Sequence, residues 1–78
     1  MHELAAAQDV VKTALAVAEA EGAQRIVAIV LKLGSLYGVD QMRDLIAMEA
    51  KGTIAEGARL DIESVAGPSI QVESIEVE

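Results

Sequence analysis

The stretch that most constrains the fold is RIVAIVLKL, from Arg25 to Leu33. It is rich in β-branched residues and lies between Gly22 and Gly34, a pattern typical of a strand. Alternation places apolar residues on both faces, with Val27, Ile29, Leu31 and Leu33 on one and Ile26, Ala28 and Val30, beside Lys32, on the other. Such a strand is expected at the centre of a sheet or covered on both sides.

Helices are predicted on both sides of this strand. From Glu3 to about Glu21, apolar residues recur at three- and four-residue spacing, and Gly22 suits the position just past the helix end. The predicted buried stripe comprises Leu4, Ala7, Val11, Ala14, Leu15 and Ala18. After a loop, a second helix is predicted with Asp40 as its N-cap, Asp44 in its first turn and Gly52 at its end.

Two further strands are predicted in the last third of the chain. Leu60 and Ile62 alternate with charged residues, and a final strand covers 70–77. The apolar positions of this last strand change phase near Ser74, which predicts a bulge. The turn 66–69 is expected to join the two strands as a hairpin.

The pattern therefore predicts a small α+β sandwich, with a three-stranded sheet and two helices on one face, in the order helix, strand, helix, strand, strand. The 78 residues suffice for a single domain, 1–78. Its core must be aliphatic, because Tyr37 is the only aromatic residue. A thin core with an open sheet face permits a homodimer.

Composition excludes several functions. The net charge of −7 and the six dispersed basic residues disfavour nucleic-acid binding. No basic leader is visible, and the longest apolar run, 26–31, is too short to span a bilayer, so we expect no membrane partner. The absence of cysteine fits a cytoplasmic protein. With one histidine and no cysteine, no nucleophile–base pair can be built, so we expect no enzyme.

The one histidine follows the initiator methionine. His2 is either an incidental surface residue or part of a metal site that includes the chain terminus. The Met1 amine, the backbone nitrogen and imidazole of His2, and the nitrogen of Glu3 can form linked chelate rings. Such nitrogen-rich tetragonal ligation suits Ni(II) or Cu(II). The site requires Met1 to be the true terminus, and the bulk of His2 favours retention of that methionine.

The carboxylates are weaker candidates. Asp61, Glu63, Glu73, Glu76 and Glu78 could suggest a hard-cation or acid–base site. Their alternating positions favour a solvated sheet face instead. We therefore predict metal ligands only at Met1, His2 and Glu3, and no catalytic residues.

Four stretches, MHELAAAQDVV, VLKLGSLYGVD, AKGTIAEGARLDI and VESIEVE, resemble the HypA/HybF family of [NiFe]-hydrogenase nickel-incorporation proteins. The resemblance implies a nickel metallochaperone that holds Ni(II) mainly through His2, with Met1 and Glu3 contributing. It implies three partners: a nickel-handling maturation GTPase, the hydrogenase large subunit and, in some bacteria, urease accessory proteins.

The chain departs from the family in one large respect. Family members carry a zinc domain with two CxxC pairs between the last two strands, whereas here residues 66–69 bridge the gap. We therefore expect no structural zinc. The alternative function is a metal-free docking module that binds the maturation GTPase, which the loss of the zinc domain favours and the intact Met-His-Glu start disfavours.

Overall fold

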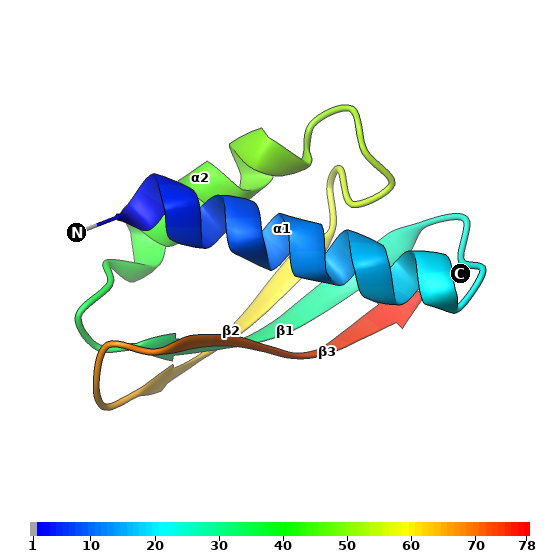
Figure 1. Cartoon of the computed structure of the whole chain (residues 1–78). Coiled ribbons are helices and arrows are strands. Elements are labelled where there is room, and N and C mark those ends of the chain that lie inside the picture. Colours follow the sequence, from blue (N-terminus) through cyan, green and yellow to red (C-terminus); the bar gives the residue numbers. More distant parts are fainter. Residues whose placement is uncertain (1) are drawn as a thin grey trace.

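The computed structural model describes residues 2–78 of the protein. Five elements follow one another: α1 (Glu3–Ala20), β1 (Ile26–Gly34), α2 (Val39–Ala50), β2 (Arg59–Val65) and β3 (Ile70–Val77). Both helices lie on one face of a single three-stranded sheet (Figure 1). The predicted α+β architecture and element order are confirmed.

The sheet has the strand order β2-β1-β3. The central position of β1 is confirmed, and this strand runs parallel to β2 and antiparallel to β3. The predicted hairpin is wrong, because β3 pairs with β1 rather than with β2. Pairing on both sides satisfies the backbone groups of the most apolar strand, which water cannot reach.

The connection between β2 and β3 crosses the end of β1 at Gly34. The Gly34 N–H donates to the Ser69 carbonyl at 2.7 Å. A Cβ atom at Gly34 would lie 2.6 Å from the Ser69 oxygen and closer still to the Gly67 oxygen. Only glycine therefore leaves room for the crossing.

The bulge predicted near Ser74 is confirmed. Val30 lies opposite Ser74 and Leu31 lies opposite Val72, so Glu73 is the extra residue on β3. A bulge of this kind lets the apolar residues on either side of it face the same layer.

A second bulge, on β1, was not predicted. Val27 is an extra residue between Ile26 and Ala28 in the pairing with β3. It brings Ile26 into the buried cluster with Ile29, Leu31 and Leu33, whereas strict alternation had placed Ile26 on the opposite face.

The core lies between the helices and β1, and it is aliphatic as predicted. Its largest fully buried side chains are Ile26, Ile29, Leu31, Leu33, Met42 and Ile46. Helix α1 contributes mainly small side chains: Ala6, Ala7, Val10, Val11, Ala14 and Ala18. Leu4 was expected in this stripe, but it is 47% exposed. Tyr37 is half-buried and packs against the cluster.

Both helices end as predicted, but the start of α2 differs in two respects: Asp40 is not its N-cap, and Asp44 lies beyond the first turn. Gly22 has φ 66°, and the N–H groups of Gly22 and Ala23 bond to the carbonyls of Glu19 and Ala18, a Schellman end as predicted. Helix α2 begins earlier than predicted, so its N-cap is Gly38. Asp40 therefore lies inside the first turn, where its charge still complements the helix dipole.

The sheet face away from the helices is polar and ion-paired. Arg59 contacts Asp61 at 2.9 Å on its own strand and Glu76 at 2.7 Å on β3. Lys32 on β1 contacts Glu73 at 3.2 Å. The solvated, charged face predicted for these carboxylates is therefore confirmed.

Candidate metal centre

His2 lies at the very start of α1. It is the N-cap residue, its side chain is exposed, and its carbonyl accepts the first helical hydrogen bond from Ala6 at 2.9 Å. Glu3 begins the helix and is half-buried. Met1, the third predicted ligand, lies outside the described residues.

The backbone nitrogens of the first turn of α1 have no side-chain cap. Ala6 is the residue that donates to His2, so the N–H groups of Glu3, Leu4 and Ala5 precede the helical ladder. A helix of this length normally satisfies such groups with a Ser, Thr, Asp or Asn cap, or with water. An amide nitrogen of this turn can therefore bind a metal without breaking an intrahelical bond.

His2 and Glu3 face a hollow between the starts of the two helices. The hollow has a volume of about 490 Å³. It is lined by His2, Glu3, Leu4, Ala5 and Gln8 from the start of α1, and by Gln41 and Leu45 from α2. A hollow of this size has room for an ion beside the exposed imidazole of His2.

Side chains alone do not form a metal site in the described part of the chain. Residues 2–78 contain no group of three His, Cys, Asp or Glu side chains that could hold an ion. Of the sheet carboxylates, Asp61 already accepts two hydrogen bonds from Arg59. These bonds lower the pKa of Asp61, and the carboxylates of Asp61 and Glu76 raise the pKa of Arg59. A cation bound by Asp61 and Glu76 would have to displace Arg59.

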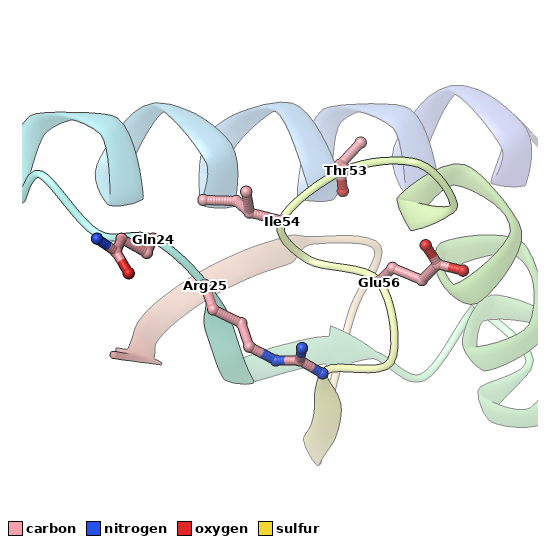
Figure 2. Close-up of a pocket in the computed structure, with 5 residues that line it drawn as sticks. All are labelled: Gln24, Arg25, Thr53, Ile54 and Glu56. Carbon is pink, nitrogen blue, oxygen red and sulfur yellow. The ribbon is translucent and has the colours of Figure 1, made fainter.

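A second hollow, of about 290 Å³, lies at another place in the fold, between the segment before β1 and the loop after α2 (Figure 2). Its lining residues are Gln24, Arg25, Thr53, Ile54 and Glu56. The Arg25 and Glu56 side chains point in different directions (Figure 2). The loop is held by bonds from Thr53 Oγ1 to the Ala50 carbonyl and from the Ile26 N–H to the Ile54 carbonyl. This hollow contains none of the predicted site residues.

The glycines of the loop after α2 are turn formers. Gly52 has φ 79° and Gly57 has φ 77°, values that side-chain-bearing residues rarely adopt. Local backbone conformation therefore accounts for both glycines of the GTIAEGA block.

Comparison with known families identifies the chain. Residues 1–76 match the family described as hydrogenase/urease nickel incorporation, metallochaperone, hypA. The chain belongs to the HypA family. The resemblance noted in the sequence is therefore confirmed, and the match includes Met1, His2 and Glu3.

Curated HypA relatives are similar over most of the chain. The hydrogenase maturation factor HypA of Methanopyrus kandleri is 42% identical over 65 residues, which cover 81% of this chain and 46% of the relative. The HypA of Chlorobium limicola is 40% identical over 72 residues, covering 90% of this chain and 62% of the relative. The HypA of Pyrococcus furiosus is 45% identical over 65 residues, covering 81% and 47%. The chain thus spans about half the length of these relatives.

Sequence reasoning found the two described candidate ligands but not their surroundings. The structure brings His2 and Glu3 to one hollow, as expected from their adjacency. Gln41 and Leu45 were not predicted to lie beside them. No spacing or motif signals this arrangement, because it depends on how α2 packs against α1. Within the described residues, no helix is both long and apolar enough to cross a membrane.

Proposed function

We propose that this domain binds Ni(II) at Met1, His2 and Glu3 and delivers it to [NiFe]-hydrogenase during maturation. The observation that carries the proposal is the position of His2: an exposed imidazole at the N-cap of a helix whose first amides have no side-chain cap. Membership of a nickel-incorporation family supports nickel as the ion.

The donor set fits the ion. The imidazole and backbone nitrogen of His2, the Met1 amine and the Glu3 nitrogen are the kind of ligands that Ni(II) prefers in tetragonal geometry. The positive end of the helix dipole opposes a cation at this place. Deprotonated amides and the Glu3 carboxylate, which lies in the first turn, offset that opposition.

Delivery requires a site that can also release the ion. A chelate at the chain terminus needs only local rearrangement to open, in contrast to a site enclosed by several elements. The exposed position of His2 lets an acceptor protein approach the ion directly. The partners proposed from the family are the maturation GTPase and the hydrogenase large subunit, with urease accessory proteins as a further class. Under the same proposal, the domain acts in the cytoplasm.

The test is a nickel titration of protein with an untagged, mass-verified Met1 terminus. We expect one-to-one binding with a square-planar d–d absorption band. His2→Ala should lose the band, and one extra N-terminal residue should weaken binding, because it moves the amine away from the chelate. A matched control is Gln24→Ala, an exposed residue in the second hollow, which should bind as the wild type does.

Each other outcome has a distinct meaning. Binding that survives both His2→Ala and the extension would overturn the terminal site. Absence of specific nickel binding in the wild type would favour the alternative, a metal-free module that docks on the maturation GTPase. Retained GTPase binding by His2→Ala, measured by calorimetry, would show that docking and metal binding are separable.

A further inference from the structure

Gln41 of α2 lines the hollow beside His2 and has no role in the proposed chelate. Gln41 lies in the first turn of α2, and it is exposed. Its Cβ and Oε1 lie beside Gly38, where a Cβ atom would meet them at 3.7 and 3.9 Å. Gln41 nevertheless lines the same hollow as His2, and its exposed carboxamide is free of any side-chain packing that would hold it away from the imidazole.

A metal-bound imidazole also requires a hydrogen-bond acceptor for its second ring nitrogen, and residues that line this hollow can provide one. The ring nitrogen that does not bind the metal carries a proton, and proteins almost always give it a hydrogen-bond acceptor that fixes the tautomer and the ring orientation. Three of the side chains that line the hollow have an acceptor oxygen: Glu3, Gln8 and Gln41. The Glu3 carboxylate already offsets the helix dipole in the proposed site, and Gln8 lies more than one turn further along the same helix as His2.

We infer that Gln41 is a positioning residue of the nickel site: its carboxamide oxygen accepts the hydrogen bond from the ring N–H of His2. The inference rests on the proposed function. Gln41 thereby ties the chain terminus to α2 and holds the imidazole in the orientation that binds the ion. The uncharged amide orients the ring without adding negative charge that would slow release of Ni(II).

The effect of removing such a partner is measurable. Loss of an outer hydrogen-bond partner typically weakens metal binding by about 10- to 100-fold. The expected result is a nickel Kd raised by that factor in Gln41→Leu, which keeps the size of the side chain and removes the acceptor. Gln41→Glu keeps an acceptor oxygen at the same place and should retain tight binding.

The experiment uses calorimetric nickel titrations of the untagged protein and NMR of the nickel-loaded form. Square-planar Ni(II) is diamagnetic, so the ring N–H of His2 can be observed in a ¹H–¹⁵N spectrum. We expect a slowly exchanging signal in the wild type and in Gln41→Glu, and its loss in Gln41→Leu. The matched control is Gln71→Leu, an exposed glutamine on β3, which should match the wild type in both measurements.

The outcomes separate this inference from the proposed function. Equal Kd values for Gln41→Leu and Gln71→Leu would overturn the role of Gln41 and leave the terminal nickel site standing. Weaker binding with an unchanged His2 ring signal would also overturn it, because the loss would then not pass through the imidazole. Failure of the wild type to bind nickel would overturn the proposed function and this inference together. Far-UV circular dichroism of each variant checks that the fold is intact.

Discussion

Replacing Gly34 by alanine should destabilise the domain strongly, although it adds only one methyl group. The added Cβ would lie 2.6 Å from the Ser69 oxygen and 2.9 Å from the Ser69 nitrogen, and nearer to the Gly67 oxygen. All three atoms are backbone, so no side chain can turn away to make room. The connection 66–69 must move, and the 2.7 Å bond from the Gly34 N–H to Ser69 is then lost or lengthened.

The magnitude follows from two contributions. Forcing an extra methyl group into a packed site costs about 1–3 kcal/mol. A lost backbone hydrogen bond adds about 0.5–1.5 kcal/mol. The sum of about 2–4 kcal/mol is a large part of the roughly 4–12 kcal/mol expected for a domain of this size. It corresponds to a fall in Tm of about 10–30 °C.

The assay is urea unfolding followed by far-UV circular dichroism, because the chain has no tryptophan and one tyrosine. Gly38→Ala is the matched control: its backbone φ is −76°, and the nearest atom to an added Cβ is 3.7 Å away. We expect it to change stability by less than about 1 kcal/mol, since the weaker N-cap and the stiffer unfolded chain oppose each other. A Gly34→Ala variant as stable as Gly38→Ala would refute the steric argument.

Two further perturbations test the core and the charged face. Leu31→Ala should lower the free energy of unfolding by about 2–5 kcal/mol, because Leu31 is fully buried. Leu36→Ala, at a position 61% exposed, should change it by less than about 0.5 kcal/mol. Similar urea midpoints for the two variants would contradict the assigned core. Arg59→Leu should return the pKa of Asp61 upwards towards its ordinary value, as followed by carboxyl ¹³C NMR. Because the folded-state pKa of Asp61 is depressed, its stabilising contribution is present above the ordinary aspartate pKa and is lost as pH falls through the folded value. The wild type should therefore lose more stability than Arg59→Leu between neutral and acidic pH, and parallel pH profiles would count against the Arg59–Asp61 pairing.

Local patterns determined much of this protein before any packing is considered. The apolar, β-branched run of β1 requires neighbours on both sides, because its backbone groups and side chains cannot face water. The period of α1 and the glycine after it specify where that helix lies and ends. The phase change in β3 predicted the bulge at Glu73, because side chains alternate strictly along a strand.

Tertiary structure alone decided how these elements combine. Nothing local indicates that the connection 66–69 crosses Gly34 so that β3 pairs with β1, because the deciding contact joins backbone atoms that lie far apart in the chain. The bulge at Val27 arises only from the pairing with β3, and it moved Ile26 to the core side. The same reason applies at the terminus: His2 and Glu3 could be proposed as ligands from their own chemistry, whereas Gln41 becomes their neighbour only when α2 packs against α1.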